Sequence, residues 1–195
     1  MSEPVTDKIG IIILAAGYSK RFCADKRQAI LSTGLKLLDT TLQQIPDNFH
    51  QRLLVLHPGD EEFAGRYIPD WSICIAEDAA LGMGHSLAAA MQQVKSCNAV
   101  LIGLGDMPYI LTETYLSIRN ALKDYPIVRP YWQGKAGNPV GFRIEFFEEL
   151  AELHGDQGAR KLLEQHAKEV YRLDCPDKGV IRDIDSKAEL STDSQ

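Results

Sequence analysis

Two groups of side chains in this sequence have the chemistry to bind a phosphate and its metal ion: a cationic loop near the N-terminus and aspartates that follow apolar runs. In the loop, Arg21 and Lys26 come after the apolar run Ile11–Leu14 and the small residues Ala15–Gly17. Small residues let the backbone approach an anion closely, and their N–H groups can point toward it. Because Arg21 and Lys26 add positive charge beside that anion, the segment predicts a phosphate-binding loop.

This first loop differs from the two best-known phosphate motifs. It contains neither G-x-x-x-x-G-K-[ST] nor G-x-G-x-x-G. An ordinary tight turn between a strand and a helix, with solvated cations, is therefore an alternative interpretation of the same residues.

An aspartate follows a second apolar run, Ala99–Leu104, in the sequence G-D-M-P. Mg²⁺ prefers one or two carboxylates together with substrate phosphates, so Asp106 at the end of a strand is a candidate magnesium ligand. A turn aspartate that caps neighbouring backbone N–H groups is the alternative, because such turns are common. The presence of the phosphate-binding loop favours the metal interpretation.

Two more carboxylates, Asp183 and Asp185, flank Ile184 near the end of the sequence. We expect a short strand at Val180–Ile184, and alternate side chains of a strand point to the same face. Asp183 and Asp185 then share one face while Ile184 points into the core. If this strand and Ala99–Leu104 belong to one sheet, a carboxylate from each can converge on one Mg²⁺.

A glycine-rich segment, Leu81–Leu87, is expected to contact a ligand at a third position. Gly82 and Gly84 permit positive φ angles and close approach. Ser86 can cap the helix that follows or donate to a ligand. His85 falls in the first turn of that helix, where a histidine is more often a polar surface or capping group than a catalytic one.

Alternating strands and helices are expected to position these loops. The strand-like runs are Ile9–Leu14, Arg52–Leu56, Ser72–Ala76, Ala99–Leu104 and Pro126–Pro130, and the segments with helical spacing are Leu35–Gln44, Glu61–Tyr67, His85–Lys95 and Thr112–Lys123. This alternation predicts an α/β fold: a Rossmann-like domain with a mostly parallel central sheet flanked by helices. Ligands of such sheets bind beyond the carboxyl ends of the strands, which is where the chemical loops fall.

The pattern changes after Pro130. We expect a turn or hairpin at Tyr131–Gly137, a strand at Asn138–Phe142, helices at Glu145–Leu153 and Gly158–His166, and strands at Val170–Leu173 and Val180–Ile184. No repeat, low-complexity tract or linker interrupts the sequence. Residues 1–195 are therefore expected to form one domain whose last few residues are disordered.

Composition excludes several classes of protein. The 195 residues are 45% hydrophobic, and the formal net charge of −6 argues against a general nucleic-acid binder. No apolar stretch approaches the roughly 20 residues that span a bilayer, so no membrane association is expected. The first residues lack the pattern of a signal peptide, and the four cysteines form neither a C-x-x-C pair nor an evident disulfide framework. A cytoplasmic location is the default expectation.

Taken in order, the motifs resemble those of the molybdenum cofactor nucleotidyltransferases (the MobA-like NTP transferases), and most closely those of the cytidylyltransferase branch. The resemblance spans nearly the whole chain, and the ordered set is far more specific than any single motif. It rests on L-A-A-G-x-S-x-R…K in the first loop, G-M-x-x-S-L after the third strand, G-D-x-P at Asp106, G-D-x-G-A-R at Asp156 and D-I-D at Asp183–Asp185.

The resemblance implies a reaction in which CMP moves from CTP to a phosphorylated acceptor, with release of pyrophosphate and with Mg²⁺ as cofactor. The acceptor is expected to be a pterin phosphate, molybdopterin or molybdenum cofactor, and transient contact with a molybdoenzyme is expected. The first loop has Ala16 where the guanylyltransferase branch has glycine. The resemblance therefore favours cytosine over guanine.

The resemblance also assigns roles to individual residues. Arg21, Lys26 and Asp106 are expected to be catalytic, and Asp106 and Asp185 to bind the metal, with Asp183 as the alternative to Asp185. The nucleotide is expected to contact the first and third loops, and the acceptor to contact a strand start and a helix start. The residues are Leu14, Ala15, Ala16, Gly17, Arg21, Lys26, Gly82, Met83 and Ser86 for the nucleotide, and Asn138, Pro139 and Asp156 for the acceptor.

Two positions depart from the family pattern. Asn138 stands where the family has histidine, and asparagine cannot take up a proton. Cys23 stands where the family commonly has glycine, so a positive φ angle there would be strained. Three rival functions stay open: a guanylyltransferase, a sugar-phosphate nucleotidyltransferase, and a nucleotide-binding protein without catalysis, which should lack the paired aspartates.

Overall fold

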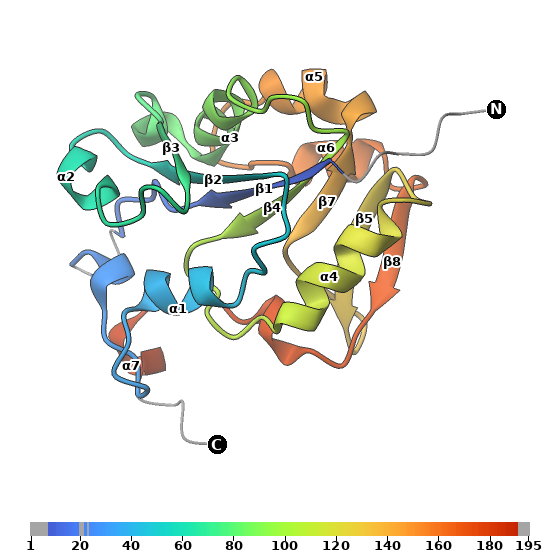
Figure 1. Cartoon of the computed structure of the whole chain (residues 1–195). Helices are drawn as coiled ribbons and strands as arrows, with labels where there is room; N and C mark the ends of the chain where they lie inside the picture. Colours follow the sequence, from blue (N-terminus) through green and yellow to red (C-terminus); the bar gives the residue numbers. More distant parts are fainter. Residues whose placement is uncertain (1–7, 20–21, 23, 191–195) are drawn as a thin grey trace.

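A computed structural model describes residues 8–19, 22 and 24–190 of the chain and builds them around one mixed sheet (Figure 1). Within these residues the sheet has eight strands, in the order β3-β2-β1-β4-β7-β5-β6, with β8 paired to β5. The strands are β1 (Ile9–Leu14), β2 (Gln51–Leu56), β3 (Ser72–Ile75), β4 (Ala99–Leu104), β5 (Ile127–Trp132), β6 (Lys135–Ala136), β7 (Val140–Arg143) and β8 (Val170–Asp174).

Four neighbouring strands, β3, β2, β1 and β4, are parallel, and β8 is parallel to β5. β7 lies between the two groups and is antiparallel to both β4 and β5. The predicted α/β fold with a mostly parallel sheet is thereby confirmed. Because Leu14 of β1 pairs with Leu104 of β4, the loops that follow these two strands leave the sheet side by side.

Helices cover both faces of the sheet (Figure 1). Alternation along β1 sends Ile11 and Ile13 to the face of α1 and α4, and sends Ile12 and Leu14 to the face of α3, α5 and α6. The helices are α1 (Leu37–Gln43), α2 (Glu61–Ala64), α3 (Met83–Met91), α4 (Thr112–Ala121), α5 (Phe147–Ala151), α6 (Arg160–Gln165) and α7 (Lys187–Leu190), with 3-10 turns η1 (Lys26–Gln28), η2 (Ala79–Leu81), η3 (Ile144–Phe146) and η4 (Lys178–Ile181). Among the described residues, no helix combines the length and the hydropathy needed to cross a bilayer.

The strand predicted at Val180–Ile184 is wrong. Residues Lys178–Ile181 form the 3-10 turn η4 instead. The Gly179 N–H donates to Asp177 Oδ1 at 2.8 Å, and a Cβ added at Gly179 would lie 2.7 Å from the Ile110 nitrogen. This backbone packs against the loop at Tyr109 and Ile110, and the Arg182 N–H donates to the Gly179 carbonyl within the turn, so the segment forms no strand ladder.

Candidate active site

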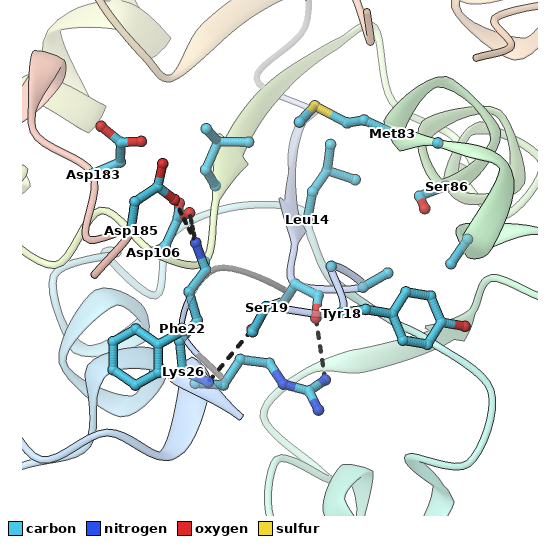
Figure 2. A pocket seen from close by; sticks show the side chains of 18 of the residues that line it. Leu14, Tyr18, Ser19, Phe22, Lys26, Met83, Ser86, Asp106, Asp183 and Asp185 are labelled. Carbon is cyan, nitrogen blue, oxygen red and sulfur yellow. Dashed lines mark hydrogen bonds and ion pairs between the residues drawn. The ribbon is translucent and has the colours of Figure 1, made fainter. Parts of the chain in front are cut away.

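A cavity of about 460 Å³ lies beside the carboxyl ends of β1 and β4 (Figure 2). It is lined by the loops that follow these strands and by the start of α3. Figure 2 shows an ammonium and three carboxylates gathered on one side of Leu14 and the first residues of α3 on the other. We refer to these parts as the aspartate end (Lys26, Asp106, Asp183 and Asp185) and the α3 end (Gly82, Met83 and Ser86).

Most of the residues that the sequence singled out line this cavity. They are Leu14, Ala15, Ala16, Gly17, Lys26, Gly82, Met83, Ser86, Asp106, Asp156 and Asp185. Asn138 and Pro139 do not line it. They precede β7, where the Asn138 N–H donates to the Val180 carbonyl at 2.8 Å. Arg21 and Cys23 lie outside the described residues.

The loop after β1 leaves the core beside open space. The Ala15 N–H donates to the Val55 carbonyl, and the Gly105 N–H donates to the Leu14 carbonyl, both at 2.9 Å. Ala15 and Ala16 are buried, whereas Gly17 is exposed. A Cβ added at Gly17 would meet no atom within 4 Å. The loop is therefore fixed at its base and has room for a ligand at its tip.

Arg27 holds this loop in place, a role that sequence analysis missed. Its buried guanidinium donates to both oxygens of Asp60 at 2.5 and 2.9 Å, to Asp25 at 2.8 Å and to the Ala15 carbonyl at 3.1 Å. Burial acts to lower the pKa of Arg27, but the hydrogen bonds with Asp60 and Asp25 outweigh it and raise that pKa above its usual value. Arg27 therefore positions Ala15 through its backbone.

We expect Asp60→Asn to lower the free energy of unfolding by about 2 kcal/mol, because hydrogen bonds to charged groups contribute roughly 1.5–3 kcal/mol. Asp60 and Arg27 are each only 6% exposed, so water does not replace the lost charge. Urea unfolding measures the change. Asp47→Asn is the matched control, since its side chain pairs with Arg52 but is 91% exposed, and a loss of about 0.5 kcal/mol or less is expected. Equal losses in both variants would contradict this role of Asp60.

The Lys26 ammonium joins two aspartates at the aspartate end. Its Nζ donates to Asp106 Oδ2 at 2.6 Å, to Asp185 Oδ1 at 3.0 Å and to the Ile184 carbonyl at 3.3 Å. Burial acts to lower the pKa of Lys26, but the charges and hydrogen bonds of Asp106 and Asp185 outweigh it and raise that pKa. Lys26 is therefore charged at neutral pH.

The three carboxylates at this end form a candidate metal site. Asp106, Asp183 and Asp185 each offer an oxygen within 4.8 Å of the others. Asp106 Oδ1 is buried and has no hydrogen-bond partner among the described residues. Burial raises the pKa of Asp106; Lys26 acts to lower it, and the charge of Asp183 acts to raise it. An all-oxygen set with an unpaired buried oxygen fits a hard divalent cation.

Asp185 reaches the cluster although no strand precedes it. Ile184 is 1% exposed, and its N–H donates to the Asp106 carbonyl at 3.0 Å, which fixes this segment beside the loop after β4. Asp183 and Asp185 flank Ile184, and both line the cavity. The alternation of the three side chains is therefore as the sequence suggested, although the backbone that carries them is not a strand.

The α3 end is built from two segments far apart in the sequence. Gly82 precedes α3 with a φ angle of +124°, and the Gly84 N–H donates to the Gly155 carbonyl at 2.7 Å. A Cβ added at Gly82 would lie 2.5 Å from Asp156 Oδ1, and one added at Gly84 would lie 2.7 Å from the His154 carbonyl oxygen. The turn at residues 154–158 therefore packs directly on the start of α3, a contact that the sequence did not predict.

Tyr18 is a further lining residue that the sequence pattern does not single out. This side chain lines the cavity, and its ring stacks on His57 with centroids 4.6 Å apart and an angle of 15° between the planes. It occupies the variable position of L-A-A-G-x-S, so its motif does not specify an aromatic residue. The only available signal was an aromatic side chain directly after a predicted phosphate-binding loop.

Comparisons with known proteins bear on this site. The family model described as MobA-like NTP transferase domain matches residues 11–170. Over 122 residues the chain is 30% identical to the purine catabolism protein PucB of Bacillus subtilis (strain 168). That match covers 61% of this chain and 59% of PucB, so the chain spans about three fifths of the length of this curated relative.

Two solved structures resemble the chain over most of its length. One is a homologue of Mycobacterium tuberculosis Rv0371c from Mycobacterium sp. strain JC1, with 28% identity, a TM-score of 0.83 and coverage of 95% of this chain and 96% of that chain. The other is Rv0371C of Mycobacterium tuberculosis H37Rv in complex with manganese, with 26% identity, a TM-score of 0.71 and coverage of 86% and 88%.

Proposed function

Because the chain belongs to the MobA-like NTP transferase family of nucleotidyltransferases, we propose that it transfers CMP from CTP to a phosphorylated acceptor and releases pyrophosphate. The motifs predicted this family, and the match over residues 11–170 confirms it. The choice of CTP rests on Ala16 and on the G-M-x-x-S-L segment. The choice of a pterin phosphate acceptor, molybdopterin or molybdenum cofactor, rests on the resemblance of the ordered motifs.

One observation carries the proposal. Lys26 and Asp106 come from different loops, yet their side chains meet at 2.6 Å in the cavity that the backbone of Leu14–Gly17 also lines. A triphosphate and a divalent cation need this combination of a free loop backbone, a cation and carboxylates. The paired aspartates also favour a catalytic protein over one that only binds nucleotides.

In the proposed reaction an oxygen of the acceptor phosphate bonds to the α-phosphorus of CTP, while the bond from that phosphorus to the β-phosphate oxygen breaks. The acceptor is already an anion, so positioning and charge neutralisation matter more than a protein base. The main chain at Ala15–Gly17 binds the triphosphate. Lys26, with Arg21, neutralises the charge that develops on pyrophosphate.

In this proposal Mg²⁺ is held by Asp106 and Asp185, with Asp183 as the alternative to Asp185. When bound, Mg²⁺ neutralises phosphate oxygens and orients the reacting groups. The unpaired Asp106 Oδ1 supports this assignment, as does the manganese complex of a protein that is 26% identical. The carboxylates supply the negative charge that a divalent cation requires, and the Lys26 ammonium neutralises part of that charge.

Asn138 and Pro139 remain proposed contacts of the acceptor. A Cβ added at Gly103 of β4 would lie 3.6 Å from the Pro139 Cβ, so Pro139 lies next to the strand that leads to Asp106. An acceptor bound here approaches the aspartate end from the side of β7. Transient contact with a molybdoenzyme and a cytoplasmic location are parts of the same proposal.

A thermal-shift panel of CTP, GTP, ATP and UTP with MgCl₂ tests the choice of nucleotide. At 100 times its dissociation constant, a ligand of the folded state adds about 2.7 kcal/mol of stability. We expect CTP to raise the melting temperature most, because groups that pair with one base edge are left unpaired by another. A shift with GTP that equals or exceeds the shift with CTP would assign the protein to the guanylyltransferase branch. Pyrophosphate release with molybdopterin then separates catalysis from binding alone.

A further inference from the structure

We propose that Asp156 selects the base of the nucleotide: its carboxylate accepts a hydrogen bond from the exocyclic amino group of cytosine and so distinguishes CTP from UTP. This inference rests on the proposed function, because it assigns a protein partner to the base of the proposed substrate. The motifs predict that Asp156 contacts the acceptor. The structure places it at the α3 end of the cavity, whereas Asn138 and Pro139 do not line the cavity.

The turn at residues 154–158 fixes the position of Asp156. Gly155 and Gly158 have φ angles of +72° and +50°, which let the chain fold back between α5 and α6. The Gly84 N–H donates to the Gly155 carbonyl at 2.7 Å, and a Cβ added at Gly158 would lie 2.9 Å from Met83 Sδ. The turn is thus held on the first residues of α3 both by a hydrogen bond and by packing.

The carboxylate of Asp156 is available to a ligand. Its Oδ1 lies 2.5 Å from where a Cβ of residue 82 would be, and the side chain lines the cavity. The structure shows no hydrogen-bond partner for it among the described residues. The cations that line the described part of the cavity, Lys26 and Arg27, are paired with other carboxylates. Asp156 therefore presents an unpaired acceptor at the α3 end.

The α3 end suits the base of a nucleotide better than its phosphates. A triphosphate is attracted to Lys26 and to a metal ion held by the aspartate end, and a carboxylate such as Asp156 repels it. Figure 2 shows the aspartate end and the first residues of α3 on opposite sides of Leu14. A nucleotide whose phosphates lie at the aspartate end therefore places its uncharged base near Asp156.

Outside the aspartate end, five described lining residues carry side-chain groups able to hydrogen-bond: Tyr18, Ser19, Arg27, Ser86 and Asp156. The Arg27 guanidinium is paired with Asp25 and Asp60. A hydroxyl both donates and accepts, so Tyr18, Ser19 and Ser86 do not distinguish an amino group from a carbonyl. An ionised carboxylate only accepts. Cytosine presents an amino group where uracil presents a carbonyl oxygen, so Asp156 pairs with cytosine and opposes uracil.

A binding cycle tests the contact directly. The probes are CTP, UTP and the triphosphate of the 2-pyrimidinone riboside, which has a hydrogen in place of the amino group. Dissociation constants are measured by titration calorimetry with MgCl₂ and without acceptor, for the unmodified protein, Asp156→Ala and Asp156→Asn. In the unmodified protein, removal of the amino group should weaken binding about tenfold, as expected for a hydrogen bond to a charged group.

In Asp156→Ala, removal of the amino group from the nucleotide should weaken binding less than about twofold, because the carboxylate that accepts its hydrogen bond is gone. Asp156→Asn should reduce the preference for CTP over UTP about tenfold, because an amide can donate to the uracil carbonyl. Asp78→Asn is the matched control. This change also removes one negative charge, from the turn before α3, but Asp78 does not line the cavity. Asp78→Asn should therefore leave the ratio of the dissociation constants for CTP and UTP unchanged.

The outcomes separate the inference from the proposed function. A preference for CTP, with an amino-group effect that is as large in Asp156→Ala as in the unmodified protein, would overturn the role of Asp156 alone. A preference for GTP over CTP in the unmodified protein would overturn the proposed function and this inference with it. Urea unfolding of the variants checks the fold, which should be unaffected because the Asp156 side chain is exposed.

Discussion

Replacement of Asp106 by asparagine is expected to lower the rate of CMP transfer about 10³-fold. Asparagine keeps the shape of the side chain but removes the negative charge that a hard divalent cation needs. The neighbouring Lys26 ammonium then faces a neutral amide, so less charge remains to hold the metal beside the phosphates. Pyrophosphate release from CTP and molybdopterin with MgCl₂ measures the rate.

The fold should tolerate this change. Burial raises the pKa of Asp106, so the ionised carboxylate is less favourable in the folded protein than in water, and a neutral amide avoids that cost. We expect the free energy of unfolding without metal to change by about 1 kcal/mol or less. Asp174→Asn, an exposed aspartate paired with Arg172 and outside the cavity, is the control for loss of one charge. Full activity in a folded Asp106→Asn protein would refute the metal assignment.

Comparison of two further variants separates the flanking aspartates. Asp185 accepts a hydrogen bond from Lys26 at 3.0 Å, and it is less exposed than Asp183. If Asp185 is the second ligand, Asp185→Asn should approach the loss seen with Asp106→Asn, and Asp183→Asn should lose less. The reverse order would assign the metal to Asp183.

Lys26→Met is expected to slow CMP transfer about 10²-fold, the scale of losing one preorganised charge contact. Methionine has a length similar to that of the lysine stem, so packing is largely kept while the ammonium is lost. Because Asp106 and Asp185 raise the pKa of Lys26, the lysine stays charged, and the ratio of the transfer rates of the unmodified protein and Lys26→Met should stay constant from about pH 6 to pH 9.

A second measurement distinguishes this role from a merely structural one. In the structure Lys26 lies where it competes with a cation for Asp106 and Asp185. Titration of Mn²⁺ without nucleotide, followed by electron paramagnetic resonance, should therefore show tighter metal binding in Lys26→Met. Lys161→Met, on the exposed surface of α6, should alter neither the rate of CMP transfer nor the affinity for Mn²⁺. Unchanged kinetics in a folded Lys26→Met protein would remove Lys26 from the site.

Strands were predictable where burial alone determines them. The runs Ile9–Leu14 and Ala99–Leu104 are apolar throughout and form β1 and β4 with the predicted bounds. The run Val180–Ile184 differs from these two because charged Arg182 and Asp183 interrupt its apolar residues, and it forms no strand. Asp177, which accepts hydrogen bonds from Gly179 and from the distant Leu111 and Thr114, ties this segment into a turn. A sequence pattern does not reveal such non-local partners.

In the cavity too, residues that are adjacent in the sequence were predictable, whereas contacts between distant residues were not. The residues of the loop after β1 were found because small residues, cations and a strand end are adjacent in the sequence. Arg27 was missed because its burial depends on Asp60, 33 residues away. The sequence shows two neighbouring cations, Lys26 and Arg27, and only the fold separates the one that lines the aspartate end from the one that supports the loop.

The packing of residues 154–158 on the start of α3 restricts how this domain can be re-engineered. A chimera that receives only the α3 start of a relative, with a side chain at position 82 or 84, would place its Cβ 2.4 Å from the Gly155 carbonyl carbon or 2.7 Å from the His154 carbonyl oxygen. Neither separation is sterically acceptable. The start of α3 and the turn at residues 154–158 therefore have to be exchanged together. Libraries that vary only one of these segments, screened for binding of a new nucleotide, should contain few folded variants.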